Sequence, residues 1–95
     1  MNYIELQGKR KLINRIAAKY GAKRIRVFGS VARGEANKTS DLDLLVDLEA
    51  NRSLFDLGGL QFDLEKSLAM PVDLVTENGL RGEIRKRVLK EAIDL

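Results

Sequence analysis

The chain has 95 residues, with 17 lysines and arginines against 14 aspartates and glutamates, and a formal charge of +3. It contains no cysteine and no histidine, which excludes a Ser-His-Asp triad, a cysteine nucleophile, a zinc site with His or Cys ligands, and any disulfide. A bound metal would have to be a hard cation held by carboxylates, Mg²⁺ or Mn²⁺ before zinc. No apolar run approaches the roughly 20 residues of a membrane span, and the N-terminus lacks the pattern of a signal peptide. We therefore expect a cytoplasmic protein with no membrane association.

The first predicted elements are a helix over residues 9–20 and a strand over residues 25–28. Apolar side chains recur in the helix at i, i+3 and i+4, and Gly21 marks its end. The apolar positions are Leu12, Ile13, Ile16, Ala17 and Tyr20.

The middle of the chain predicts a turn, a short helix and a second strand. The turn at residues 29–30 leads into a helix over residues 30–33, which stops at Gly34 and is followed by a polar loop over residues 35–40. Residues 41–48 then alternate in polarity, which predicts a half-buried strand. One face of this strand carries Leu42, Leu44, Val46 and Leu48, and the other carries Asp41, Asp43, Leu45 and Asp47.

A third long segment begins at Ser53, a helix N-cap residue with Asp56 three positions later. The adjacent glycines at 58–59 weaken this helix, so an alternative start lies nearer Leu60. Pro71 prevents the helix from continuing. The apolar stripe of the helix is Leu57, Leu60, Leu64 and Leu68.

The chain ends with a predicted strand over residues 72–75 and a last helix. This helix starts at Thr76 or Asn78 and runs through Ile93, with inward positions Leu80, Ile84 and Val88. Strands separated by helices predict one layered α/β or α+β domain over residues 1–95, with a small mixed sheet of three to four strands flanked by helices.

Charge is distributed unevenly along the chain. Residues 1–26 hold eight basic residues and one acid, residues 27–75 hold four and nine, and residues 76–95 hold five and four. The basic start is either a solvated helix face or a surface for a phosphate-bearing ligand or an acidic partner. With two tyrosines, three phenylalanines and no recognition motif, we expect no direct binding of nucleic acid.

Asp41 and Asp43 are the first candidates for chemistry. Two positions apart on a strand, their side chains project from one face about 6–7 Å apart, so both can converge on metal ions. Two Mg²⁺ ions form the usual clamp for displacement at phosphorus. Taken alone, such a pair more often belongs to an exposed strand face with ordinary alternation.

Gly29, Ser30 and Arg33 are candidates for binding phosphate. Gly29 lets a ligand approach the backbone, and the free N–H groups at a helix start attract anions. The Ser30 hydroxyl can donate to a phosphate, and Arg33, three residues later on the same helix face, can donate to it in bidentate fashion. The alternatives are a simple helix cap and a surface arginine.

Asp73 stands alone among apolar residues of the strand over 72–75. If this strand pairs beside residues 41–48, Asp73 completes a set of three carboxylates. It could then bind metal or take a proton from an attacking hydroxyl. The alternative is an acid at the sheet edge that faces solvent.

Together these residues resemble a known family. Gly-Ser at 29–30, ten residues, Asp-x-Asp at 41–43 and a later strand aspartate are similar to the nucleotidyltransferase superfamily of DNA polymerase β. Within this superfamily, the chain resembles the minimal nucleotidyltransferases, the MNT proteins. The resemblance rests on the short length and on two motifs, Gly-Ser-Val-Ala-Arg-Gly and Ser-Asp-Leu-Asp-Leu-Leu-Val. The resemblance covers essentially the whole chain and implies the nucleotidyltransferase fold.

The resemblance also implies an activity and roles for residues. Family members transfer a nucleoside monophosphate from a nucleoside triphosphate and release pyrophosphate. By position, Asp41, Asp43 and Asp73 would be catalytic and bind two Mg²⁺ ions. The triphosphate of ATP would be held by Gly29 and Ser30, with help from Arg33.

MNT proteins are typically antitoxins paired with a helical HEPN ribonuclease toxin, to a tyrosine of which they attach AMP. The resemblance thus implies AMPylation of a protein within a hetero-oligomer. Two alternatives stay open: transfer to a small molecule, with a partner subunit completing the pocket, and a catalytically idle module that neutralises its partner by contact.

Overall fold

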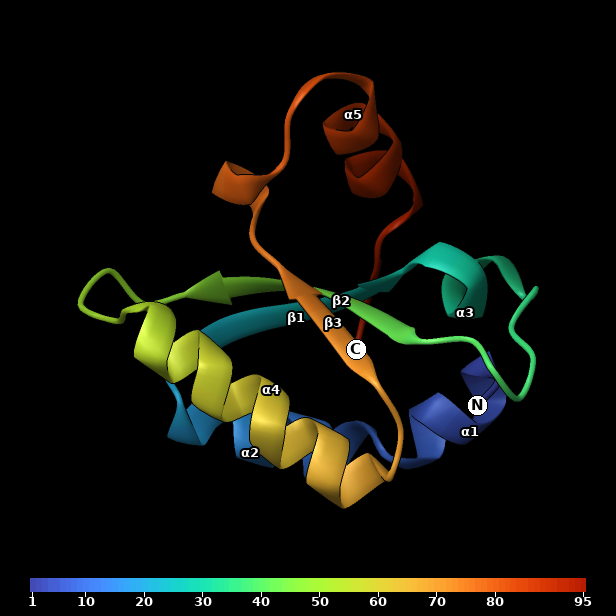
Figure 1. Ribbon diagram of the computed structural model, residues 1–95, viewed down its shortest axis with the longest axis horizontal. Coiled ribbons are helices and arrows are strands. Elements are labelled where there is room, and N and C mark those ends of the chain that lie inside the picture. The colour runs from blue at the N-terminus through green and yellow to red at the C-terminus, as the bar shows by residue number, and fades with distance from the viewer.

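A four-stranded mixed sheet lies at the centre of the computed structural model, which describes all residues from 1 to 95 (Figure 1). The strand order is β3-β2-β1-β4. β1 (Ala22–Phe28) pairs antiparallel with β2 (Leu42–Leu48) and with β4 (Ile93–Asp94), whereas β2 and β3 (Val72–Val75) are parallel. The predicted mixed sheet with flanking helices is confirmed.

Helices cover both faces of this sheet. Helices α2 and α4 lie on one face and α5 lies on the other (Figure 1). None of the helices combines the length and the apolar character needed to cross a membrane. The helical elements are α1 (Tyr3–Gly8), α2 (Arg10–Lys19), α3 (Gly29–Arg33), α4 (Leu54–Leu68), the 3₁₀ turn η1 (Glu77–Gly79) and α5 (Gly82–Glu91).

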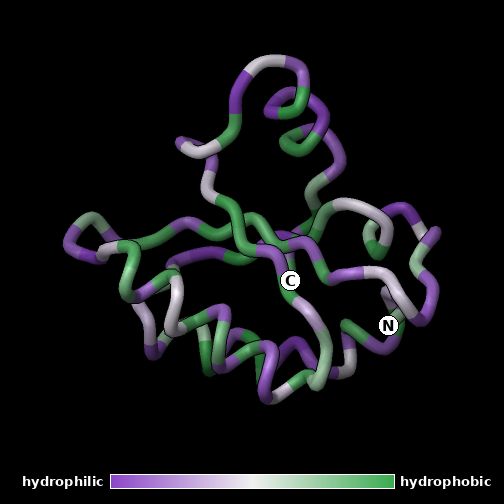
Figure 2. The backbone as a smooth tube through the Cα atoms, viewed as in Figure 1, coloured by the Kyte–Doolittle hydropathy of each residue, from purple (hydrophilic) through white to green (hydrophobic).

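The larger core lies between the sheet and helices α1, α2 and α4. Alternate residues of β2 point into it, as the polarity pattern predicted. Figure 2 shows green and purple alternating along α2 and α4, which turn their apolar stripes toward the sheet. Each fully buried Leu, Ile or Val contributes about 1.5–3 kcal/mol relative to an exposed one. The completely buried side chains of this core include Leu6, Ile13, Val27, Leu42, Leu44, Val46, Leu60 and Leu64.

The second face of β2 is also covered in part, so the prediction that this face is exposed was wrong at Leu45. Leu45 is fully buried there with Leu80 and Val88, in a small core beneath η1 and α5. The sequence pattern did not indicate this core, because only one of the three β2 positions on that face, Leu45, is apolar. Ile84, predicted to point inward, is 58% exposed.

Both ends of the chain differ from the prediction. Asn2 accepts a hydrogen bond from the Glu5 N–H and starts α1, a helix that was not predicted and that inserts Leu6 into the core. The predicted last helix is divided into η1 and α5, and its end is instead β4. Arg24 holds Asp94 of β4 through two hydrogen bonds of 2.7 and 3.1 Å. The backbone pairing of β4 with β1 replaces the end of the predicted helix, and this exposed ion pair accompanies it.

Helix α4 begins at Leu54, so the alternative start near Leu60 was wrong. Ser53 and Asp56 form the predicted capping box, with the Ser53 hydroxyl accepting from the Phe55 N–H and the Asp56 carboxylate from the Ser53 N–H. The helix ends at Leu68, and Ala69 follows with φ 55°.

The start of β3 is tied back to α4. Pro71 precedes the strand, and the Val72 N–H donates to the Glu65 carboxylate at 3.0 Å. This contact satisfies a backbone donor at the outer strand of the sheet. It also fixes where β3 begins relative to the helix that precedes it.

The two glycines inside α4 have different roles. A Cβ on Gly58 meets nothing within 4 Å, whereas a Cβ on Gly59 would lie 2.6 Å from the Tyr20 ring. The Tyr20 hydroxyl donates to Asp63, which anchors the ring in this position. Gly59 therefore allows Tyr20 to pack closely against α4.

We predict that Gly58→Ala stabilises the protein by about 0.5–1 kcal/mol, because alanine favours the helix and meets no obstacle here. Gly59→Ala should instead destabilise it by about 1–3 kcal/mol, since the methyl group collides with the anchored ring. Urea unfolding of both variants checks this. Equal shifts of the two unfolding free energies would contradict the packing argument.

Candidate active site

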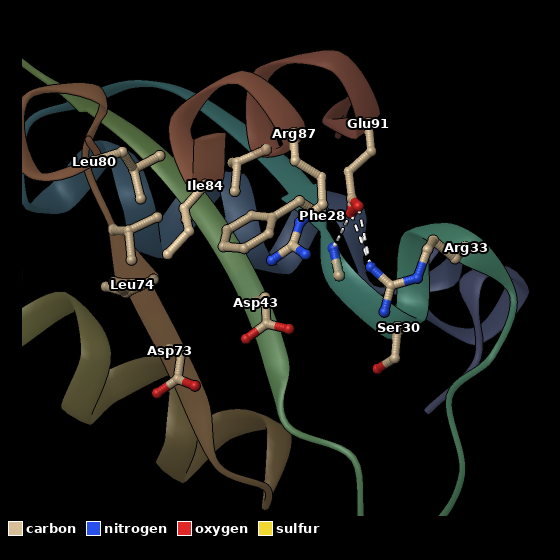
Figure 3. A pocket seen from close by; sticks show the side chains of 13 residues that line it. Phe28, Ser30, Arg33, Asp43, Asp73, Leu74, Leu80, Ile84, Arg87 and Glu91 are labelled. Carbon is tan, nitrogen blue, oxygen red and sulfur yellow. Dashed lines mark hydrogen bonds and ion pairs between the residues drawn. The ribbon is translucent and has the colours of Figure 1, made fainter. Parts of the chain in front are cut away.

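The parallel pairing of β2 and β3 brings two aspartates together. Asp43 and Asp73 occupy paired positions in the register, on strands that lie about 4.8 Å apart. Figure 3 shows both carboxylates pointing into the same cavity from neighbouring strands. Neither carboxylate forms an ion pair with a basic side chain.

The short helix α3 faces these carboxylates from the end of β1. Gly29 has φ 74° and is buried, and a Cβ at this position would lie 2.2 Å from the Asp43 Oδ2 atom. Only glycine therefore permits the start of α3 to approach Asp43 so closely. Ser30 and Arg33 follow on the same helix and line the same cavity (Figure 3).

The cavity has a volume of about 460 Å³. Its polar and apolar walls lie at different ends (Figure 3). The polar side chains are Ser30, Arg33, Asp43, Asp73, Arg87 and Glu91, and the apolar ones are Phe28, Leu74, Val75, Leu80, Ile84 and Val88. A ligand with both a charged and an apolar part fits this division.

Burial raises the pKa of Asp43 to about 6. The carboxylates of Asp73 and Asp41 add to the shift, and Arg33 partly opposes it. Asp43 thus sits in a concentration of negative charge that only a cation or a proton relieves.

The donors of α3 are occupied by a carboxylate from α5. The Gly29 N–H donates to Glu91 Oε2 at 3.1 Å, and Arg33 Nη1 lies 3.0 Å from both carboxylate oxygens of Glu91. Arg33 Nε also donates to Glu35 at 2.8 Å. These bonds raise the pKa of the Arg33 guanidinium above its usual value.

Asp41 lies apart from the other two aspartates. It is exposed, precedes the first residue of β2 and does not line the cavity. No three acidic side chains of the chain come close enough together to hold a metal ion as a group. The structure therefore brings together five of the six predicted site residues and places Asp41 near the margin, where its charge still acts on Asp43.

Arg87 and Glu91 also line the cavity, although neither was among the predicted site residues. Both belong to a helical stripe of α5 at i, i+3, i+4 and i+7, which begins with Ile84 and includes Val88. The presence of two charged residues within an otherwise apolar stripe was the signal in the sequence that pointed to a site. Because the helix was predicted to continue to Ile93, Glu91 was not recognised as its last residue.

The donor set of the cavity suits a hard divalent cation. Asp43 and Asp73 supply carboxylate oxygens, the ligands that Mg²⁺ prefers, and no basic side chain neutralises them by direct contact. Binding of such an ion would favour the ionised form of Asp43 and reverse the effect of burial on its pKa.

Comparison with known proteins identifies similar chains. A family model described as "Nucleotidyltransferase domain" matches residues 9–95. A candidate protein adenylyltransferase of Methanocaldococcus jannaschii is 43% identical over 95 residues, which cover 100% of this chain and 99% of that protein. The protein adenylyltransferase MntA of Thermococcus cleftensis is 44% identical over 75 residues, 79% of this chain and 76% of that one.

Solved structures agree with these sequence matches. A structure described as a candidate minimal nucleotidyltransferase has a TM-score of 0.88 and 48% identity, and the match covers 100% of this chain and 97% of that chain. A crystal structure of a toxin–antitoxin with AMP-PNP has a TM-score of 0.76 at 21% identity, over 90% of this chain and 70% of that chain, and shares the fold.

We predict that Gly29→Ala destabilises the protein by about 2–4 kcal/mol, combining the cost of a positive φ with the clash against Asp43. Gly34→Ala is the matched control, because Gly34 has the same φ of 74° and an open space around its Cβ position. It should cost about 1 kcal/mol. Urea unfolding measures both, and similar losses in the two variants would show that the contact with Asp43 is unimportant.

We also predict that the metal-free protein loses stability as the pH rises from about 4 to about 6. In the unfolded chain Asp43 ionises near its ordinary pKa of 3.8, whereas in the folded protein it holds its proton up to about 6. Asp43→Asn should remove this decline. Urea unfolding across this pH range, with a chelator present, tests it, and an identical pH profile in the variant would contradict the assignment.

Proposed function

The chain belongs to the nucleotidyltransferase domain family, and on that premise we propose that it transfers the AMP unit of ATP to a hydroxyl group of a partner protein. The observation that carries the proposal is the placement of Asp43 and Asp73 opposite Ser30 and Arg33 in one cavity. Carboxylates for cations and donors for phosphate are the two groups that nucleotidyl transfer needs side by side.

We place the nucleotide in this cavity with its triphosphate against the polar side chains. Gly29, Ser30 and Arg33 would bind the triphosphate as hydrogen-bond donors. Asp43 and Asp73, with Asp41 at the margin, would hold two Mg²⁺ ions, which when bound neutralise charge on the reacting phosphates.

The reaction requires little covalent work from the protein. The oxygen of the acceptor hydroxyl forms a bond to the α-phosphorus of ATP while the bond to the β-phosphate oxygen breaks, and pyrophosphate leaves. The proton of the hydroxyl passes to a carboxylate of the site, for which Asp73 is our choice. The chain orients the reactants and supplies charge complementarity, so the absence of histidine is no obstacle.

The partner is proposed on the relatives. One is a protein adenylyltransferase named MntA, and chains of the same fold occur in toxin–antitoxin crystal structures. We propose that residues 1–95 form one minimal nucleotidyltransferase domain that acts as an antitoxin in the cytoplasm. Its acceptor would be a tyrosine of a HEPN-type toxin, bound in a hetero-oligomer.

The exposed border of the cavity supports a protein acceptor. The cavity accounts for the nucleotide end of the reaction, and its mouth is bordered by the exposed Ile84. A partner protein that docks at this border would supply a further wall along with its own hydroxyl group.

The proposal is tested by label transfer from ATP in a lysate that contains the partner. We predict that label at the α-phosphate appears in one protein band, and that label at the γ-phosphate does not. Asp43→Asn and Asp73→Asn should each reduce transfer at least about 100-fold, because removing an electrostatic group from such a site costs this much. Removal of Mg²⁺ with a chelator should abolish it.

The control is Glu83→Gln, on the exposed side of α5 and away from the cavity. Mass analysis of the band identifies the partner and the modified residue. Label in small molecules alone would favour a small-molecule acceptor. Unchanged neutralisation of the partner in cells by the Asp43→Asn, Asp73→Asn double variant would favour a module that acts by contact.

A further inference from the structure

Glu91 occupies the positions where we expect oxygens of the triphosphate. Its carboxylate accepts from the Gly29 N–H and from Arg33, two of the three groups assigned to phosphate (Figure 3). The third, Ser30, lies beside them on α3. A carboxylate and a phosphate group accept from the same donors in similar geometry.

The fold holds Glu91 in this position. Its side chain is only 17% exposed, and it lies at the last residue of α5. Val88, one turn earlier, is buried in the small core under α5 and fixes the helix against the sheet. Immediately after Glu91 the chain turns into β4, which pairs with β1. The contact with α3 is therefore set by packing on both sides and is not a chance encounter of surface side chains.

Glu91 and a phosphate group cannot use these donors together. Two anions within hydrogen-bond distance of one guanidinium would repel each other strongly in a partly buried site. When a phosphate binds to Gly29 and Arg33, the Glu91 carboxylate has to leave them. The free energy of its present contacts is then subtracted from the free energy of binding.

Arg87 gives the released carboxylate a new partner. It stands four residues before Glu91 on the same face of α5 and lines the same cavity. It forms no ion pair in this structure. An arginine and a glutamate at this spacing on a helix are within reach of each other.

We propose that Glu91 sets the affinity of the nucleotide site for phosphate groups by competing with them for Gly29 and Arg33. The inference rests on the proposed function. A triphosphate displaces Glu91 because its other phosphates and its nucleoside contribute further contacts. Inorganic phosphate lacks these contacts and is therefore excluded. Glu91 thus lowers the affinity of every phosphate ligand, and only a ligand with further contacts, such as a nucleoside triphosphate, still binds well.

The test compares Glu91→Gln with Glu83→Gln. Glutamine has the shape of glutamate without its charge, so it competes more weakly for Arg33. Glu83 is the matched control, because it lies on the same helix with a 90% exposed side chain and forms an ion pair with Lys86 outside the cavity. Calorimetric titration with AMP-PNP and with inorganic phosphate, each with Mg²⁺, measures binding to the three proteins.

We expect Glu91→Gln to bind AMP-PNP about tenfold more tightly than the wild type, since a hydrogen bond to a charged group contributes about this factor. Inorganic phosphate should gain by a similar factor, because it displaces the same carboxylate from the same donors. In the transfer assay the KM for ATP should decrease while kcat is retained. Glu83→Gln should match the wild type in every measurement.

A second pair of variants separates competition from a structural role. If Glu91 mainly held Arg33 in place, Glu91→Gln and Glu91→Ala would bind AMP-PNP more weakly and lower kcat, which would overturn the proposal. The gain should also disappear in the Arg33→Gln, Glu91→Gln double variant when it is compared with Arg33→Gln alone. Thermal unfolding verifies that each variant is folded.

A further measurement uses the wild-type protein and therefore does not depend on whether any variant folds. NMR of the Glu91 side-chain carboxyl carbon should report a change of environment when AMP-PNP binds. An unchanged signal in the bound protein would overturn the proposal alone. If AMP-PNP does not bind to the wild type or to any variant, the proposed nucleotide function fails and this inference fails with it.

Discussion

Asp43 and Asp73 lie side by side because β2 and β3 are paired in parallel and in a register that aligns them. The strands belong to segments separated by the whole of α4, so this proximity is a property of the tertiary structure. The inward leucines and valines of β2 enforce the register, since a shift by one residue would turn them to the wrong face. The same apolar residues that stabilise the sheet thus aim the two carboxylates into the cavity.

The two faces of the sheet have different roles, one in stability and one in forming the site. One face buries the large core under α2 and α4 and provides most of the stability. The other is covered only in part, by η1 and α5, and its uncovered end is the cavity. In this chain of 95 residues, one sheet therefore serves both as the scaffold of the fold and as a wall of the site.

Local signals were sufficient for much of this architecture. The alternation in residues 41–48, the capping box at Ser53 and the glycines at 29 and 34 each determine structure within a few residues, and the structure contains all of these elements. Residues 93–94 form a strand by pairing with Arg26 and Val27 of β1, which lie near the other end of the sequence. The role of Glu91 likewise depends on a contact with Arg33 across 58 residues. Such contacts leave no pattern in the neighbouring sequence, and reasoning from local periodicity could not find them.

The edges of the sheet limit how another protein can bind. At one edge β4 is only two residues long. At the other edge β3 has four residues, begins after Pro71, and its Val72 N–H is already bonded to Glu65. These features leave little free backbone for an incoming strand, as is common in proteins that avoid sheet-to-sheet association. Strand addition is therefore disfavoured, and a partner of the proposed kind would recognise side chains on the helices or at the mouth of the cavity. Recognition by side chains depends on sequence in a way that backbone pairing does not, and this would help closely related pairs of proteins in one cell to remain separate.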